Sequence, residues 1–307
     1  MDRRTFLKRQ AQGLLWLSAG PALLSAAPAF AETAAPDVAV VKGKAAAATR
    51  AAVDMLGGMS RFVKPGNKVV IKPNMSFAKD VDSATNTHPE VVRELLIMCK
   101  EAGAAQVRIL DHSLQNPEQS MDLSGIRPAC DGVEQNLCHH LMNAGQYVTA
   151  PIPDYAEMRE NAFMRDVLAA DVLIACPVAK SHSGAGVSLS LKGQMGLIFD
   201  RRIMHSRYNL DSSIVDMNKK ILPTLAVIDA TRVLTTGGPG GPGKVITPGE
   251  IIASADPVAA DATAVASYEW YGRKMQPGQV GHIRLAHERK LGRMDIENLV
   301  TGRMGPA

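Results

Sequence analysis

Short apolar runs rich in Val, Ile, Leu and Ala alternate with helical patterns along most of this chain. Strands are expected at residues 38–41, 68–71, 106–110, 171–176, 224–229 and 249–254. Helices are expected between them, at 45–56, 89–101, 165–170 and 256–268. Parallel neighbouring strands need a crossover connection, which is usually a helix. The sequence therefore predicts an α/β fold, with a mainly parallel sheet and helices on both faces.

The 307 residues are expected to divide into a leader and a folded part. Residues 1–31 are interpreted as a signal peptide. Residues 32–307 have the length of one large α/β domain, or of two closely packed halves that cover about 32–165 and 166–307.

The leader carries the pattern of a twin-arginine signal, beginning with RRTFLK (residues 3–8). The apolar segment behind it, 13–27, is interrupted by Gly20 and Pro21 and is too short for a stable membrane span. AFA (29–31) supplies the small residues of a cleavage site. We expect the twin-arginine translocase to export the protein to the periplasm, with cleavage after Ala31 and no stable membrane span in the mature chain. An uncleaved membrane anchor is the alternative.

The charge balance gives no reason to expect a nucleic-acid partner. The whole chain has 34 Lys and Arg against 30 Asp and Glu. Removing the four basic residues and the one acidic residue of the leader leaves 30 against 29. The mature chain is therefore close to neutral, whereas nucleic-acid-binding domains are usually strongly basic.

Cysteine spacing argues against an iron–sulfur cluster. The four cysteines, at positions 99, 130, 138 and 176, show no Cys-x-x-Cys pattern, so a zinc ribbon is not expected either. Cys130 and Cys138 could close a small disulfide in an oxidising compartment, or could remain thiols. Cys99 and Cys176 are expected to be buried thiols.

Polar residues follow most of the expected strands. Lys72 and Asn74 follow the second strand, Asp111 and His112 follow the third, Lys180 and His182 follow the next, and Asp229 and Asp256 follow later ones. Parallel strands direct their carboxyl ends to one edge of the sheet, where α/β proteins bind ligands. We therefore expect these side chains to share a ligand crevice at the strand ends, although a single Asp in this position is often a helix cap or turn former.

The segment CPVAKSHSGAGVSLSLKGQMGLIFDRRIMH (176–205) combines cations with glycines directly after an apolar run. Its titratable residues are Lys180, His182, Lys192, Arg201, Arg202 and His205. An apolar strand followed by glycines and charged groups predicts a ligand site, and a solvated glycine-rich loop is the alternative.

Lys192 lies in an alternating stretch, SLSLK (188–192), that predicts a strand with Ser188, Ser190 and Lys192 on one face. A lysine held in this way could bind a phosphate or carboxylate, or act as a base or nucleophile if it is desolvated. An exposed lysine in a salt bridge is the alternative.

These patterns define a set of candidate residues, because imidazole is the commonest nitrogen ligand of metals and lysine binds anions. The predicted catalytic residues are His112, His182 and Lys192; the predicted cofactor-binding residues are Lys72, Asn74, Lys180 and Lys192; and the predicted metal ligands are His182, His205, Asp229 and Asp256, with Asp261 as a further candidate.

GPGGPGK (238–244) matches the first seven positions of a phosphate-binding loop. Val245 stands where such a loop needs Ser or Thr, the prolines remove backbone donors, and Pro248 prevents a long helix from following. This segment is therefore expected to be a loop and not a nucleotide site.

The chain resembles the bacterial and archaeal "domain of unknown function 362" proteins across most of the mature length. The resemblance rests on VVIKPNM (69–75), TNTHPEVVRELL (85–96), the segment from Lys180 to Gly193, LAVIDATRV (225–233) and ASADPVAADATA (253–264). Many relatives carry an added ferredoxin-like cluster domain. Its cysteine pattern is missing here, so the resemblance does not imply electron transfer through iron–sulfur centres.

A more distant likeness is to lactate racemase and its relatives, which hold a nickel-pincer cofactor at histidines and a lysine. His112, His182, Lys192 and His205 occur in a similar order. The likeness implies that Lys192 tethers or contacts the cofactor, that His205 binds the metal, and that His112 and His182 form an acid–base pair.

The expected function is that of an exported α/β enzyme that binds a metal or metal-containing cofactor together with a small anionic substrate. An isomerase or racemase and a hydrolase are both compatible with the candidate residues. A periplasmic protein that binds a metal or anion for a redox partner, without catalysis, is the alternative.

Overall fold

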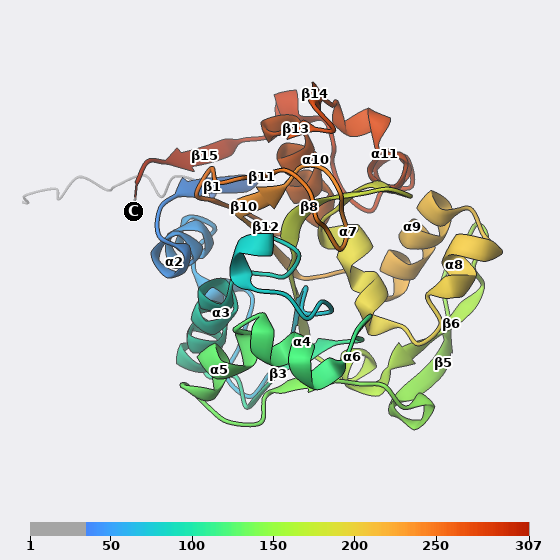
Figure 1. Cartoon of the computed structure of the whole chain (residues 1–307), viewed down its shortest axis with the longest axis horizontal. Helices are drawn as coiled ribbons and strands as arrows, with labels where there is room; N and C mark the ends of the chain where they lie inside the picture. The colour runs from blue at the N-terminus through green and yellow to red at the C-terminus, as the bar shows by residue number, and fades with distance from the viewer. Residues whose placement is uncertain (1–34, 307) are drawn as a thin grey trace, which may run out of the picture. The chain divides into compact units, whose positions relative to one another are not determined.

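An eleven-stranded sheet forms the centre of residues 35–306, the part of the chain that the computed structural model describes (Figure 1). The expected signal peptide, 1–31, lies outside these residues. The main path of the sheet is β15 (Thr301–Met304), β1 (Val38–Lys42), β12 (Glu250–Ser254), β10 (Leu225–Leu234), β7 (Val172–Cys176), β2 (Lys68–Pro73), β3 (Gln106–Asp111) and β4 (Cys138–His140). Residues from Ala35 onward form one compact unit.

Most neighbouring strands of the sheet are parallel. β10, β7, β2, β3 and β4 pair in parallel, as do β1 and β15. β12 is antiparallel to both of its neighbours, β1 and β10. The predicted mainly parallel α/β sheet is therefore confirmed, with one reversed strand inside it.

Helices cover both faces of the sheet, as the sequence predicts. One face is covered by α2 (Ala45–Met55), α3 (Pro89–Glu101) and α5 (Ile126–Asp131), and the other by α7 (Ser190–Gly193), α9 (Leu210–Lys220), α10 (Pro257–Ser267) and α11 (Gly281–Glu288). In Figure 1 these two groups lie on opposite sides of the strands.

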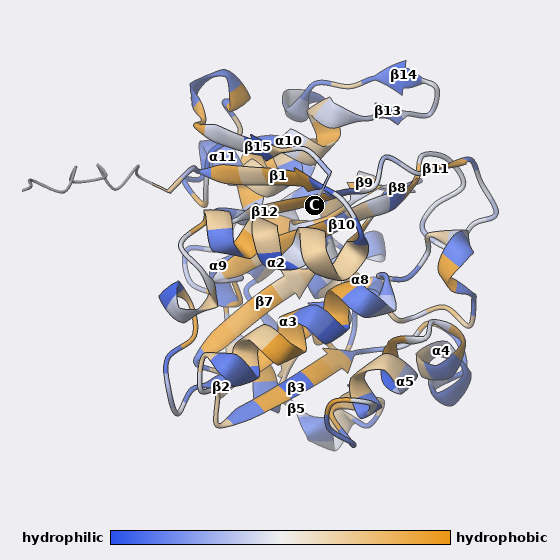
Figure 2. Ribbon diagram, turned by 90° about the vertical axis from the view of Figure 1, so that its left-hand side faces the viewer, coloured by the Kyte–Doolittle hydropathy of each residue, from blue (hydrophilic) through white to orange (hydrophobic). Residues whose placement is uncertain are grey.

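Alternation along each strand divides the core into two layers. Val38 and Val40 of β1 pack with the α9–α11 layer, whereas Ala39 and Val41 pack with α2 and α3. All five residues of β7 are buried because both sheet faces are covered. Figure 2 shows the resulting pattern, with hydrophobic β2, β3 and β7 behind amphipathic α3.

The start of α3 is stabilised by a proline in the first turn and by a side-chain cap. Pro89 occupies the first turn, where its missing N–H removes no helical hydrogen bond. The Nδ1 atom of His88 accepts a hydrogen bond from the Glu90 N–H at 3.1 Å, so His88 is the N-cap.

Several short elements were not expected from the sequence. They are the hairpin β5 (Tyr147–Pro151) and β6 (Glu160–Met164), the hairpin β13 (Glu269–Trp270) and β14 (Arg273–Lys274), β11 (Val245–Ile246), and the short helices α4 (Pro117–Leu123) and α8 (Arg202–Ser206). α6 (Arg165–Leu168) is shorter than the predicted helix.

The glycine-rich segment after β7 is an ordered hairpin and not a flexible loop. β8 (Val178–His182) extends along β10, and β9 (Gly186–Ser188) pairs antiparallel with β8. The prediction of a continuous strand through Lys192 is wrong, because α7 begins at Ser190.

All four cysteines are buried free thiols. A hydrogen bond with Cys130, together with burial, raises the pKa of the Cys138 thiol. Among residues 35–306, the helices are too short or too polar to cross a membrane.

Candidate functional site

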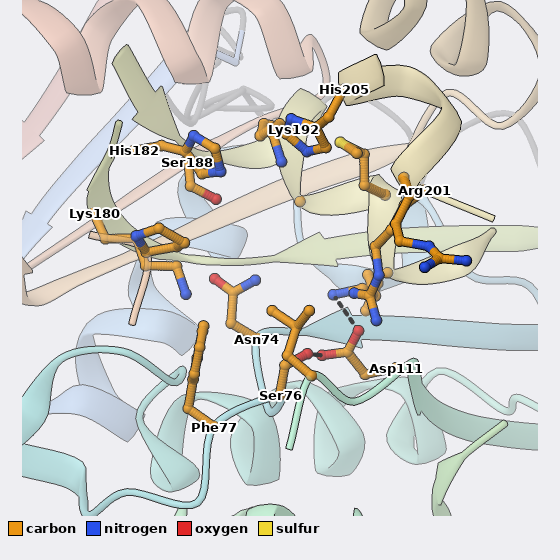
Figure 3. A pocket seen from close by; sticks show the side chains of 17 residues that line it. Asn74, Ser76, Phe77, Asp111, Lys180, His182, Ser188, Lys192, Arg201 and His205 are labelled. Atoms are coloured by element: carbon orange, nitrogen blue, oxygen red, sulfur yellow. Dashed lines mark hydrogen bonds and ion pairs between the residues drawn. The ribbon is translucent and has the colours of Figure 1, made fainter. Parts of the chain in front are cut away.

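A cavity of about 300 Å³ opens where β2, β3 and β8 end (Figure 3). Its lining residues are Lys72, Asn74, Ser76, Phe77, Asp111, Leu114, Lys180, His182, Ser188, Lys192, Gly193, Met195, Gly196, Arg201, Arg202, His205 and Pro239. We call this cavity the cationic pocket. In Figure 3 the side chains surround a common space, with Lys180 and His182 on one side and Arg201 and Asp111 on the other.

The floor of the pocket is an ion pair between the ends of two parallel strands. Lys72 Nζ of β2 lies 3.2 Å from Asp111 Oδ1 of β3, and the two side chains are only 2% and 1% exposed. Asp111 Oδ2 also accepts hydrogen bonds from the Ser76 hydroxyl at 2.8 Å and the Met75 N–H at 3.1 Å. Burial raises the pKa of Asp111, but the charges of Lys72 and His140 outweigh it, so its pKa lies below the usual range and the carboxylate is ionised.

Gly196 allows this ion pair to form. A Cβ atom at position 196 would lie 2.0 Å from Asp111 Oδ1 and 2.5 Å from Lys72 Cε, both far inside van der Waals contact. The absence of a side chain at Gly196 therefore lets the turn after α7 close over the pair.

Lys180 of β8 is buried with polar and aromatic partners, and no carboxylate within residues 35–306 forms an ion pair with it. Its Nζ donates to the Thr85 carbonyl at 2.5 Å and lies 5.0 Å from the centre of the Phe77 ring, in a cation–π arrangement. Burial lowers its pKa to about 7, and the charge of Lys72 acts in the same direction.

Lys192 enters the pocket from the short helix α7. Asp261 of α10 accepts hydrogen bonds from the N–H groups of Ser190 and Leu191, at 2.7 and 3.0 Å, and so holds the start of α7 in place. Burial lowers the pKa of Lys192 to about 7, and the charges of Arg201 and Lys72 contribute. Lys192 is thus a buried amine, and the alternative of an exposed salt-bridging lysine is wrong.

His182 is held in one tautomer. Its Nδ1 atom accepts the backbone N–H groups of Gly184 and Ala185, at 3.1 and 3.2 Å, so the proton of the neutral ring is on Nε2. Burial lowers its pKa to about 3, with further contributions from the charges of Lys192 and His205. His182 therefore suits hydrogen-bond donation through Nε2–H better than proton abstraction at neutral pH.

Arg201 and His205 form the outer wall of the pocket. Arg201 donates to the carbonyls of His112 and Ser113, at 2.9 and 3.0 Å, which fixes its guanidinium group. The His205 ring lies nearly parallel to that of His182, with centroids 6.1 Å apart.

Asn74 presents an amide to the pocket. Its side-chain Oδ1 accepts a hydrogen bond from the Val178 N–H at 3.1 Å, and its backbone N–H donates to Thr87 Oγ1 at 2.9 Å. These bonds hold the loop after β2 against β8 and leave the Asn74 Nδ2 group as a donor for a ligand.

His112 does not join the cationic pocket, although it follows Asp111 directly. Its Nδ1 atom lies 3.2 Å from the Ile198 carbonyl, and its ring lines a neighbouring cavity. Successive side chains of a strand point to opposite sides, so Asp111 and His112 cannot face the same space. The predicted acid–base pair of His112 and His182 is therefore not brought together.

Asp229 and Asp256 also lie outside the pocket. Asp229 falls in the middle of β10, is fully buried, and pairs with Arg232 at 2.7 Å. Asp256 follows the reversed strand β12, whose carboxyl end lies at the opposite edge of the sheet, and it caps α10 by accepting the Val258 N–H. Both aspartates have structural partners instead of the predicted metal.

The predicted metal site does not fit the arrangement of donors. Within residues 35–306, no three His, Cys, Asp or Glu side chains are grouped so that they could hold a metal ion. The cationic pocket instead contains three lysines and Arg201 against one carboxylate. Such a set of charges opposes a bare cation and favours an anion.

The sequence predicted no role for some of the lining residues. Asp111 was expected at the strand-end crevice and Arg201 in the segment 176–205, but neither was assigned a binding or catalytic role. Pro239 lies in the segment dismissed as a nucleotide loop, and it forms part of the wall. The Gly238 N–H donates to Ser181 Oγ at 3.0 Å, which holds this segment against β8.

Comparisons with known proteins give the family but no activity. The thylakoid-associated protein sll1697 of Synechocystis sp. is 26% identical over 228 residues, which cover 71% of this chain and 68% of that protein. The lactate racemase apoprotein of Thermoanaerobacterium thermosaccharolyticum is 16% identical, with a TM-score of 0.48, over 71% of this chain and 54% of that one.

A protein from Thermotoga maritima is 13% identical, with a TM-score of 0.35, over 61% of this chain and 51% of that one. The chain thus spans about half of the length of each of these two solved structures. The model of one protein family matches residues 69–266, which include all the strands and lysines that build the cationic pocket. The chain therefore belongs to the family described as Domain of unknown function (DUF362).

Proposed function

We propose that the cationic pocket binds a small anion with carboxylate- or phosphate-like oxygens and is the active site of an enzyme. The observation that carries this proposal is the convergence of Lys72, Lys180 and Lys192, all buried, around one cavity with a single carboxylate. A buried charge without a partner is costly, so an anion that pairs with these lysines gains a large electrostatic free energy.

The partners of the three lysines support different roles. Burial lowers the pKa of Lys72, and the ion pair with Asp111 opposes this shift and favours the charged amine. Lys180 donates to a carbonyl, whereas Lys192 has no carboxylate among the described residues within ion-pair distance. We therefore assign Lys72 and Lys180 to anion binding, together with the Nε2–H of His182 and the amide of Asn74. The protonated form of Lys192 adds a further positive charge that attracts the anion.

Lys192 is the candidate base. With a pKa near 7, about half of its amine is neutral at neutral pH, as a general base requires. In this proposal its Nζ accepts a proton from the bound substrate and later returns it, while the surrounding donors stabilise the negative charge that develops.

A covalently held cofactor is a second candidate function for Lys192. The observation that favours it is the same buried, unpaired amine, since a neutral lysine is a nucleophile. His205 at the rim would then be available as a single additional ligand for a metal in such a cofactor. Intact-mass analysis of the purified protein tests this candidate, which requires an adduct that disappears in Lys192→Arg.

Anion binding is tested with sulfate and malonate by titration calorimetry at about pH 6.5. We expect Lys192→Met to weaken both ligands at least about tenfold, because it removes one fully desolvated charge from the site. Lys274→Met is the matched control, because Lys274 is exposed on β14, outside the pocket. Equal affinities in wild type and Lys192→Met, or no binding of either anion, would contradict the proposal.

We also propose that the protein is exported to the periplasm through the twin-arginine pathway. The support is the RRTFLK pattern and the AFA cleavage site of residues 1–31. Replacing both Arg3 and Arg4 with lysine should leave the full-length protein in the cytoplasm, whereas wild type should yield a periplasmic form that begins at Glu32. Fractionation followed by N-terminal mass analysis measures this, and periplasmic recovery of the double variant would contradict it.

A further inference from the structure

A second cavity, of about 470 Å³, lies beside the cationic pocket. Its lining residues are His112, Ser113, Leu114, Met142, Phe199, Asp200, Arg201 and Arg202. Three of them, Leu114, Arg201 and Arg202, also line the cationic pocket. The two cavities are therefore adjacent and share the Arg201 side chain as part of their lining, and we call the second one the aromatic cavity.

A fixed aromatic cluster forms one wall of this cavity. The Phe199 ring is nearly parallel to that of His112, with centroids 6.0 Å apart, and is tilted against Tyr147 at 5.1 Å. Tyr147 is buried, and its hydroxyl donates to the Leu141 carbonyl at 2.6 Å. His112 is held at the Ile198 carbonyl. The Phe199 ring is thus oriented by two neighbours that are themselves fixed.

Large apolar side chains are nevertheless exposed at this place. Phe199 is 37% exposed, Leu114 is 56% exposed and Met142 is 39% exposed. All three line the aromatic cavity, so they form one exposed apolar patch in a single hollow of the surface. An apolar patch next to a charged pocket is typical of a ligand site that binds the apolar part of an amphipathic molecule.

We propose that the ligand is an anion that carries a planar aromatic group, with its charged end in the cationic pocket and its ring on Phe199. This inference rests on the proposed function of the cationic pocket. An oriented aromatic face favours a flat ring, which stacks at the distances seen within the cluster, over a flexible alkyl chain. The guanidinium groups of Arg201 and Arg202 extend this surface, since arginine also stacks on aromatic rings.

Arg201 lies between the two cavities, where the link between the anionic group and the ring of such a ligand would run. Arg201 donates to the His112 and Ser113 carbonyls and so stays at the junction. An anionic group on one side of Arg201 therefore places an attached ring on the aromatic side. Small aliphatic anions would fill the cationic pocket and leave Phe199 exposed to water.

The test compares phenyl phosphate with methyl phosphate, which carry the same anionic group. We expect wild-type protein to bind phenyl phosphate about tenfold more tightly, because stacking and ring burial together contribute about 1.4 kcal/mol. Phe199→Ala should reduce this preference to below about threefold and leave the affinity for methyl phosphate unchanged. Tyr155→Ala, at an exposed aromatic residue outside both cavities, is the matched control.

Each outcome decides one of the two proposals. If methyl phosphate binds and phenyl phosphate binds no better, the aromatic subsite is wrong while the anion pocket stands. If neither phosphate binds, the proposed function itself fails. If wild type sediments as a dimer and Phe199→Ala as a monomer, the exposed apolar side chains serve an interface between copies, and the ligand proposal is overturned.

Discussion

Replacing Gly196 with alanine is expected to weaken anion binding strongly and to lower the stability of the fold. The added methyl group would lie 2.0 Å from Asp111 Oδ1 and 2.5 Å from Lys72 Cε, so the ion pair must separate or the turn must move. Separating a buried ion pair costs about 3–5 kcal/mol. We expect the free energy of unfolding to fall by about 3 kcal/mol in urea titrations, and sulfate affinity to fall by about a hundredfold in calorimetry.

Gly145→Ala is the matched control for this variant. A Cβ atom at Gly145 would meet nothing within 4 Å, so this change should alter neither stability nor sulfate binding. Gly196 does not have a positive φ, so any effect there comes from the contact and not from backbone strain. A Gly196→Ala protein that bound sulfate with wild-type affinity would show that the Lys72–Asp111 pair does not shape the pocket.

Sulfate affinity is expected to fall steeply as the pH rises above about 7. Lys180 and Lys192 each have a pKa of about 7 in the ligand-free protein, because burial disfavours their charged forms. A bound dianion favours the protonated amines, so binding above this pH takes up protons. The affinity should fall by about tenfold per pH unit for each lysine that is protonated on binding, and by about a hundredfold for both. Calorimetry in buffers with different ionisation enthalpies measures the proton uptake directly.

The pH dependence of sulfate affinity and the pH dependence of folding stability have opposite signs. Both lysine pKa values are lowered from 10.5, so between about pH 7 and pH 10.5 the unfolded chain binds more protons than the native protein. The contribution of these lysines to the stability of ligand-free protein therefore increases with pH in the window where sulfate affinity decreases. In the double variant Lys180→Met/Lys192→Met, the pH dependence of stability and the pH dependence of sulfate affinity should both become weaker. A sulfate affinity that stays constant from about pH 7 to about pH 9 would exclude neutral lysines in the pocket.

The sequence predicted the sheet because its strands and helices follow from local patterns. It also predicted six residues that line the pocket: Lys72, Asn74, Lys180, His182, Lys192 and His205. Lys72, Asn74 and Lys180 lie at the ends of strands that run parallel, so the rule that ligands bind at carboxyl ends placed them together. Lys192 was identified for its residue type, although its strand was predicted wrongly. Burial of these lysines depends on tertiary packing, which periodicity alone cannot show.

The predicted site residues that lie outside the pocket were misplaced for definite physical reasons. Asp256 was placed in the crevice on the assumption that every strand is parallel, but β12 is reversed. His112 was chosen over Asp111 for its chemistry, yet the alternation of β3 turns Asp111 toward the pocket. Pro239 could not be predicted as a wall residue, because the hydrogen bond from Gly238 to Ser181 that holds its segment against β8 joins positions 57 residues apart.

The anchoring of α7 by Asp261 has a consequence for the order in which the protein becomes competent to bind. Lys72 is made early in synthesis, Pro239 late, and Asp261 later still. A growing chain that ends before α10 lacks the acceptor that holds the start of α7, and one that ends before residue 239 also lacks the wall at Pro239. Under the proposed function, Lys192 is therefore expected to reach its position in the pocket only after the chain is complete through α10.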